Sequence, residues 1–448
     1  MEYFWPLLMC IALLLGIFSG YPVALVLAGI GVLFAFAADV PLIFLSTGVS
    51  RTFSGILANW LLIAVPLFVF MGLMLEKSGI AQRLLRSLAG LLGAAPGGYA
   101  FAVAIIGIVM AASTGIIGAS VVLMGVLALP VMLENRYDPR LATGVIAATG
   151  TLGILIPPSI MLVILGDQMR LSVGDLFAGA LIPGLLLGLL YVGYLVLVAI
   201  FRPHAMPPLP ARERIGFLQS ARNLARDLLA PMALILTVLG SIIAGIATPT
   251  EAAALGAVGA FLLALLSRQM TFRQFTAVLN ETTRTTAMIL FVMIGATVFS
   301  VIFRKLGGDS MISAALGLES GDTNPYRVMF VIMLFIFVLG MFLDWVEITF
   351  IVMPIVAPIV AGLNFGIPPD RVLLWFAILF AVNLQTSFLT PPFGYALFYI
   401  RGIAPPEIGT RVIYRGIIPF VVIQLTALIL TVIFPELALW LPGHLFGK

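Results

Sequence analysis

Residues Gly150–Ser159 read GTLGILIPPS and lie inside an apolar run that is long enough to cross a membrane. A proline in a helix interior removes a backbone hydrogen bond and clashes with the preceding turn, at a cost of roughly 3 kcal/mol. In lipid, the carbonyls that lose their partner have no water to bond to. The pattern returns at Asn383–Gly394, which reads NLQTSFLTPPFG. Two costly breaks of one kind indicate helices that are interrupted in order to line a site.

The composition is that of a polytopic membrane protein. Of 448 residues, 62% are hydrophobic and 9% are charged, against roughly 25% charged residues in a soluble domain. The net charge of +4 is too small and too dispersed to predict a nucleic-acid partner. The single cysteine, Cys10, excludes a disulfide framework, and with two histidines a histidine metal site is not expected.

The order of apolar segments repeats along the chain, with about 20 residues needed for each crossing. We predict a first repeat over residues 1–201, with scaffold spans in 4–76 (4–20, 22–38 and 57–76), a hairpin at 97–133, a broken helix at 141–165 and a span at 175–201. A basic linker, 202–227, leads to a second repeat over 228–434, with spans at 228–247, 251–267 and 284–303, a hairpin at 325–362 and a broken helix at 371–399. Surface helices are expected within 202–227 and 268–284, and 435–448 is expected to be a C-terminal tail. Because any long apolar chain can be cut into similar halves, chance similarity remains the alternative.

The basic residues test this arrangement. If each hairpin enters and leaves on one side, a repeat crosses the membrane five times, and the second repeat is inverted relative to the first. With Arg202–Asp227 placed in the cytoplasm, 16 of the 23 basic residues fall on the cytoplasmic side and 7 fall outside. This asymmetry follows the positive-inside rule. It predicts two inverted repeats with re-entrant hairpins, and it places both termini, and the tail, in the periplasm.

The breaks and hairpin tips carry oxygen donors and glycines. Broken helices at membrane depth are typical of transporters, where unwound carbonyls coordinate small cations. The predicted sodium-binding residues are Ser113, Gly115, Thr151, Gly153, Pro157, Gly340, Asp344, Asn383, Gln385 and Thr390. These are donors for a hard monovalent cation, and no carboxylate cluster of the kind that calcium prefers accompanies them. Beyond sodium, no metal and no cofactor is expected.

GTLGILIPPSI, followed by SVGDLFAGALIPG at Ser172–Gly184 and by the late NLQTSFLTPPFG, resembles the large membrane subunit of TRAP (tripartite ATP-independent periplasmic) transporters. The resemblance covers essentially the whole chain. It implies an elevator-type ion-transporter fold in the cytoplasmic membrane of a bacterium or archaeon, sodium coupling, and a small organic acid with a carboxylate as substrate. It also implies a periplasmic solute-binding protein and, because the chain begins directly with the first span of the large subunit, a separate small membrane subunit. Carried onto this chain, it implies substrate-binding roles for Ser113, Ser159, Asp344 and Thr390.

Three other functions remain open at this stage. A stand-alone sodium-coupled carboxylate carrier needs no binding protein. An intramembrane enzyme could use Asp344 and Glu347, whose spacing puts them on one helix face, but no nucleophile or metal set accompanies them. A passive channel does not need two paired hairpins. An ATP-driven pump is disfavoured because the chain has no GxxxxGK[ST] phosphate loop, so we expect a transporter and no enzyme.

Overall fold

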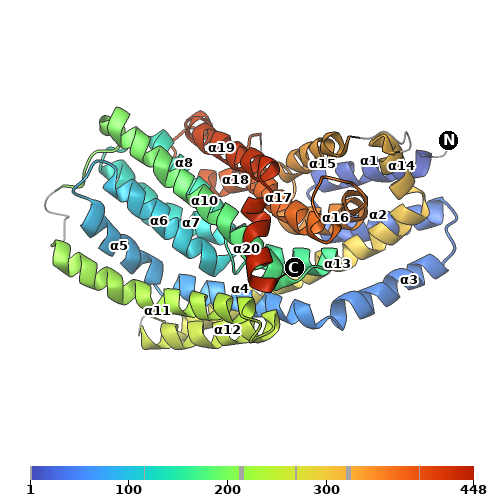
Figure 1. The fold of residues 1–448 in the computed structure, drawn as a ribbon, viewed down its shortest axis with the longest axis horizontal. Helices are drawn as coiled ribbons and strands as arrows, with labels where there is room; N and C mark the ends of the chain where they lie inside the picture. Colours follow the sequence, from blue (N-terminus) through green and yellow to red (C-terminus); the bar gives the residue numbers. More distant parts are fainter. Residues whose placement is uncertain are drawn as a thin grey trace.

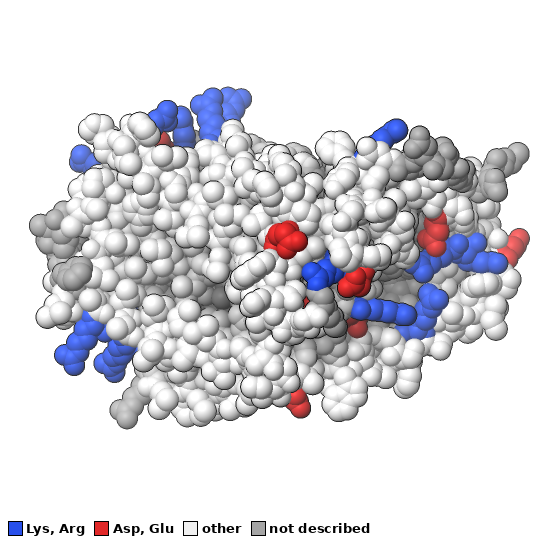
Figure 2. Space-filling view, in the orientation of Figure 1, with Lys and Arg blue, Asp and Glu red and all other residues white. Residues whose placement is uncertain are grey.

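The computed structural model describes residues 3–115, 117–210, 216–267, 270–318, 324–392 and 394–447, except for the side chains of 112–114 and 217. Within these residues the protein is all-helical (Figure 1). Eight described helices are long and apolar enough to cross a membrane. Figure 2 shows that Lys and Arg gather towards the ends of the long axis and that much of this face is uncharged, as a surface in contact with lipid requires.

The described helices form two sets, one before and one after residue 210 (Figure 1). The first contains α1 (Phe4–Phe18), α2 (Val23–Ala37), α3 (Ile43–Thr52), α4 (Ala64–Lys77), α5 (Ile80–Leu92), α6 (Gly98–Thr114), α7 (Ile117–Glu134), α8 (Pro139–Thr151), α9 (Ile160–Met169) and α10 (Val173–Phe201). The second contains α11 (Phe217–Ile243), α12 (Pro249–Leu266), α13 (Phe272–Lys305), α14 (Gly308–Ala315), α15 (Pro325–Gly340), α16 (Trp345–Ala361), α17 (Pro369–Leu389), α18 (Tyr395–Ile403), α19 (Thr410–Ile433) and α20 (Glu436–Phe446). Short π or 3-10 turns lie at Phe53–Leu57 (η1), Trp60–Ile63 (η2), Leu152–Ile154 (η3) and Pro203–Ala205 (η4).

The structure differs from the predicted boundaries in several places. The span expected at 57–76 corresponds to the apolar span Trp60–Lys77, but its start is not α-helical: Phe53–Leu57 is the π turn η1, Trp60–Ile63 is the 3-10 turn η2, and the Asn59 side chain between them accepts a hydrogen bond from the backbone N–H of Leu61. Residues 43–52 and 80–92 form the helices α3 and α5, which were not predicted.

Two more corrections concern the second half of the chain. The surface helix expected at 268–284 and the span expected at 284–303 form one helix, α13, in which Thr271 and Gln274 make a capping box at the start and no proline interrupts the helix. The C-terminal tail expected at 435–448 is largely helical where the structure describes it. Glu436–Phe446 is the helix α20, which buries Ala438 and Leu439 and packs on α10 and α17.

Helices of one half pack on helices of the other in reciprocal pairs. α2 packs on α13 while α4 packs on α12, and α8 packs on α19 while α17 packs on α10. The backbones approach closely in the first pair, because a Cβ at Gly295 would overlap the carbonyl oxygen of Ala24. The two halves therefore share one interior.

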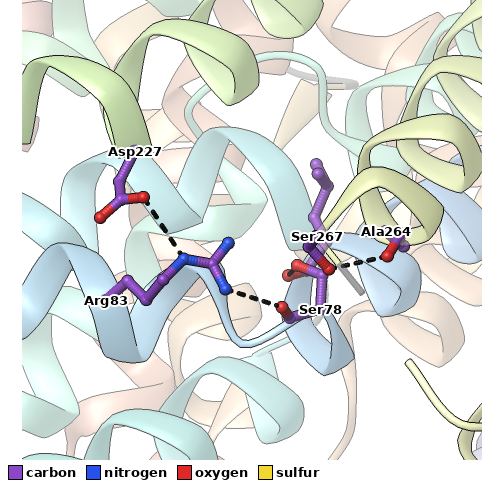
Figure 3. Close-up of polar contacts among 6 residues, drawn as sticks. Ser78, Arg83, Asp227, Ala264 and Ser267 are labelled. Carbon is purple, nitrogen blue, oxygen red and sulfur yellow. Dashed lines mark hydrogen bonds and ion pairs between the residues drawn. The ribbon is translucent and has the colours of Figure 1, made fainter. Parts of the chain in front are cut away.

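An ion pair connects the amphipathic helix α5 to the helix α11 of the second half. Figure 3 shows that Arg83 of α5 points towards both Asp227 of α11 and the end of α4. Its Nε lies 3.4 Å from Asp227 Oδ1, and its Nη1 donates to the carbonyl of Ser78, 3.4 Å away, at the C-terminus of α4. A cation at a helix C-terminus also meets the negative end of the helix dipole. These two contacts of Arg83 hold α5 against α11 and the end of α4.

A second arginine joins the long helix α13 to the helix α16. Pro358 has no N–H, so the carbonyl of Pro354, four residues earlier, loses its helical hydrogen bond. The Arg304 guanidinium of α13 donates to this carbonyl, and its Nε lies 3.7 Å from Asp309 Oδ2. Arg304 thus satisfies a backbone group that the helix itself cannot satisfy.

We expect Arg304→Ala to lower the free energy of unfolding by about 1–3 kcal/mol, because it leaves the part-buried carbonyl of Pro354 without a donor. Thermal unfolding in detergent checks this. Lys305→Ala is the matched control, since the Lys305 ammonium only lies over the Phe44 ring, 4.6 Å from its centre, a contact worth about 0.5–1 kcal/mol. Equal losses in the two variants would contradict the role given to Arg304.

Candidate functional site at the two helix breaks

The first break is unwound and sealed inside the protein. α8 ends at Thr151, η3 adds one tight turn, and the chain leaves helical geometry until α9 begins at Ile160. All residues from Thr151 to Ile160 are buried, Pro157 included. Non-helical backbone at membrane depth is tolerated when protein surrounds it. The Ser159 hydroxyl donates to the Ile154 carbonyl at 2.7 Å and so satisfies one of the groups freed by the break.

The first hairpin tip faces this break. Gly115 ends α6 with φ of +61°, a conformation that L side chains rarely adopt. A Cβ at Gly153 would lie 3.4 Å from the Ala111 carbonyl oxygen and 3.6 Å from the Gly115 nitrogen. Two predicted residues, Gly153 and Gly115, are therefore brought together with backbone facing backbone. The side chain of Ser113 lies outside the described residues.

The second break is more open than the first. α17 ends at Leu389 and α18 begins at Tyr395. The Thr390 hydroxyl donates back to the Thr386 carbonyl at 2.8 Å, and Pro392 is exposed. Residue 393 lies outside the described part of the chain.

The second hairpin tip begins α16 with a capping box. The Asp344 carboxylate accepts a hydrogen bond from the Trp345 N–H at 2.8 Å, and the Glu347 carboxylate accepts one from the Asp344 N–H at 3.3 Å. Both carboxylates thus bond to backbone donors at the positive end of a helix. This arrangement explains their i, i+3 spacing without any acid–base chemistry.

The second tip is fitted closely to the second broken helix. The Asn383 amide donates to the Met333 carbonyl of α15 at 2.8 Å. At Gly340, the last residue of α15, a Cβ would overlap the Ser387 hydroxyl and would lie 2.8 Å from Ser387 Cβ. The absence of a side chain at Gly340 is what lets the tip lie against α17.

One predicted residue of each break contacts the other. The Gln385 amide donates to the Thr151 hydroxyl at 3.4 Å, and both side chains are fully buried. The ends of the two broken helices therefore contact each other in the interior.

The sequence reasoning missed two tyrosines next to the second break. Tyr395 and Tyr399 lie one turn apart on α18, with ring centres 5.4 Å apart. The Tyr395 ring lies near the Phe388 ring of α17, with ring centres 6.2 Å apart, and a Cβ at Gly118 of the first hairpin would lie 2.6 Å from the Tyr399 ring. These tyrosines connect the end of the second broken helix with the first hairpin. Their spacing directly after Pro391–Pro392 was a signal that could have been used.

The chemistry of the site is that of neutral oxygens together with the two capping carboxylates, Asp344 and Glu347. Among the residues that the structure describes, no three His, Cys, Asp or Glu side chains gather in a way that could hold a transition metal. Hydroxyls, amides and unwound carbonyls are suitable ligands for a small hard cation. Glycines, which have no side chain, let the backbone come close to such a cation. The arrangement is suited to binding an ion and a small polar solute.

Comparisons with known proteins agree with this chemistry. The family described as "Tripartite ATP-independent periplasmic transporter, DctM component" matches residues 8–437. The chain is 30% identical to the C4-dicarboxylate TRAP transporter large permease protein DctM of Vibrio cholerae, over 96% of this chain and 95% of that protein. It is 31% identical to the isethionate TRAP transporter permease protein DctMQ of Oleidesulfovibrio alaskensis, over 85% of this chain and 58% of that protein. Among solved structures, the YdaH transporter of Alcanivorax borkumensis has a similar fold, with a TM-score of 0.58, 14% identity and coverage of 89% of this chain and 90% of that chain.

Proposed function

Because the chain belongs to the DctM-component family of tripartite ATP-independent periplasmic transporters, we propose that it imports a small organic acid carrying a carboxylate, driven by a sodium gradient. The observation that carries the sodium coupling is the pairing of each proline-broken helix with a hairpin tip, with glycine backbone facing glycine backbone at Gly153 and Gly115. The C4-dicarboxylate relative supports an acidic substrate. The chain is a multi-pass membrane protein of the inner membrane, and both termini are proposed to be periplasmic.

The partners are proposed to be a separate small membrane subunit and a periplasmic solute-binding protein. The name of the Oleidesulfovibrio relative joins the letters M and Q, and this chain matches only 58% of its length. Both facts support a further component in that relative and, by the proposal, a corresponding partner for this chain.

The proposed mechanism is an elevator built on two inverted repeats. The reciprocal packing supports the repeats: the first hairpin packs through α7 on α18, and the second packs through α16 on α9. Sodium binds at the two breaks through the predicted ligands and orders the tips, and the substrate then occupies the space bounded by Ser113, Ser159, Asp344 and Thr390. The hairpins and broken helices move together against the other spans. The differential affinity of sodium for the closed tips provides the coupling.

The alternatives predict different results. An intramembrane enzyme is disfavoured because Asp344 and Glu347 already accept backbone hydrogen bonds as helix caps. A stand-alone carrier remains the main competitor, since the geometry of the breaks is equally suited to a carrier that needs no binding protein.

The test is reconstitution of the chain with its small subunit in liposomes. We expect uptake of a labelled organic acid to require both an inward sodium gradient and the cognate binding protein. Liposomes with an equal potassium gradient are the control. Uptake without the binding protein would establish the stand-alone carrier, and uptake without sodium would remove the coupling ion from the proposal.

A further inference from the structure

Four polar side chains meet in the interior shared by the two halves. They come from four different helices and are all 0% exposed. They are Thr151 of α8, Tyr191 of α10, Gln385 of α17 and Gln424 of α19. We refer to these four residues as the cross-half network.

Each contact in the network joins one half to the other. The Gln385 amide donates to the Thr151 hydroxyl at 3.4 Å, and the Gln424 amide donates to the Tyr191 hydroxyl at 2.7 Å. The helices that carry the two pairs also pack on one another, since α17 packs on both α10 and α19. The two contacts therefore lie on helices that are in direct contact in the interior.

Thr151 and Gln385 occupy corresponding positions in front of the two breaks. Thr151 lies six residues before Pro157, and Gln385 lies six residues before Pro391. Thr151 is the last residue of α8, directly before η3, and Gln385 lies in the last turns of α17. A backbone shift at the first break therefore moves Thr151, which contacts Gln385 of the second broken helix. A shift at the second break likewise moves Gln385 against Thr151.

Stability alone does not explain the network. Among the described residues, the buried Oε1 atoms of Gln385 and Gln424 find no hydrogen-bond partner. Unpartnered polar atoms are costly in a low-dielectric interior, and apolar side chains of similar volume avoid that cost. The polar contact between the two broken helices leaves this oxygen of Gln385 unsatisfied. Such a contact is better explained by a role in coupling the two helices than by a contribution to stability.

We propose that the cross-half network couples the two breaks, so that occupancy of one ion site favours the closed form of the other. The inference rests on the proposed sodium-coupled transport. Thr151 and Gln385 then act as positioning residues through their mutual contact, and the contact between Tyr191 and Gln424 holds together α10 and α19, the helices on which α17 packs. Sodium activation is expected to be cooperative as long as the network is intact.

The test compares the sodium dependence of uptake in four variants: Thr151→Val, Gln385→Leu, Tyr191→Phe and Gln424→Leu. We expect the Hill coefficient for sodium to fall towards 1 in each, and the half-saturating sodium concentration to rise about 2- to 10-fold, as loss of one hydrogen bond predicts. If Thr151 and Gln385 act only as direct ion ligands, Tyr191→Phe and Gln424→Leu will behave as the unmodified chain, and that result would overturn the coupling.

Two neighbouring threonines provide matched controls. Thr149 and Thr386 are also 0% exposed, but their hydroxyls donate only within their own helices, to Val145 at 2.7 Å and to Val382 at 2.9 Å. Thr149→Val and Thr386→Val are expected to keep the Hill coefficient of the unmodified chain. If the Hill coefficient falls in these two control variants as far as in the network variants, the effect is not specific to the network and the inference fails.

Thermal unfolding supplies a readout that does not depend on transport. In a double-mutant cycle of Thr151→Val and Gln385→Leu, the losses in unfolding temperature are expected to be non-additive, because both remove one contact. Additive losses in unfolding temperature would show that Thr151 and Gln385 do not interact, and would overturn the network. Non-additive losses with an unchanged Hill coefficient for sodium would show that the contact is structural and does not couple the two breaks. Sodium-independent uptake by the unmodified chain would instead contradict the proposed function, and the unfolding cycle would still decide whether the contact exists.

Discussion

Asp344→Asn is expected to abolish sodium-driven uptake at ordinary sodium concentrations while leaving the chain as stable as the unmodified protein. Asparagine is as good an N-cap as aspartate, so the bond from the Trp345 N–H, 2.8 Å in length, is retained. The negative charge at the tip is lost. Hydrogen bonds and contacts to charged groups contribute about 1.5–3 kcal/mol, so the half-saturating sodium concentration should rise roughly 10- to 100-fold.

Two companion variants separate charge from structure. Asp344→Ala removes the cap as well, and should lower the free energy of unfolding by about 0.5–2 kcal/mol in addition to the loss of uptake. Glu347→Gln removes a charge from the same tip but keeps the capping box, which glutamine also forms, and it should retain uptake. Sodium titrations of uptake and thermal unfolding in detergent measure both effects. Uptake by Asp344→Asn with the sodium dependence of the unmodified chain would remove Asp344 from the ion site.

Gly340→Ala is expected to block transport for a steric reason. A Cβ at this position would overlap the Ser387 hydroxyl and lie 2.8 Å from Ser387 Cβ, and overpacking of this kind typically costs about 1–3 kcal/mol. Because the clash lies where the second tip meets α17, the cost falls on the closed tip, and uptake should decrease about 5- to 100-fold.

The clash has a specific rescue. Ser387→Gly removes both atoms that the new methyl group would meet, so the double variant Gly340→Ala/Ser387→Gly should regain part of the lost uptake. Gly362→Ala is the matched control, because the nearest atom to a Cβ there is the Ile359 carbonyl oxygen at 3.5 Å, an ordinary contact. If Ser387→Gly gives no recovery, the close fit between tip and broken helix is not what Gly340 provides.

The breaks could be predicted from the sequence because their signal is local and strong. Two adjacent prolines in an apolar run are a strong helix-ending signal, and the structure ends α8 and α17 within a few residues of each pair. The apolar hairpins are visible for the same reason, since a turn of small and polar residues divides each long run. The family assignment, which the match over residues 8–437 confirms, followed from the same motifs.

Other features depend on partners that are distant in the sequence. The helix α20 forms because α10 and α17 offer it an apolar surface, which a reading of residues 435–448 alone does not reveal. The contact between Thr151 and Gln385 joins residues 234 positions apart. Asp344 was recognised as an acidic tip residue, but its role as a cap in a reciprocal box with Glu347 is a matter of backbone geometry. The site residues remain predictions until their variants are measured.

The measurement that tests the central claim most directly is simultaneous uptake of radioactive sodium and labelled substrate into proteoliposomes that contain the chain, its small subunit and the binding protein. The account predicts that substrate triggers sodium entry, that the two fluxes keep a fixed ratio as the gradient is varied, and that Asp344→Asn at ordinary sodium concentrations loses both fluxes together. Substrate entry with no accompanying sodium would contradict sodium-coupled transport at the two breaks.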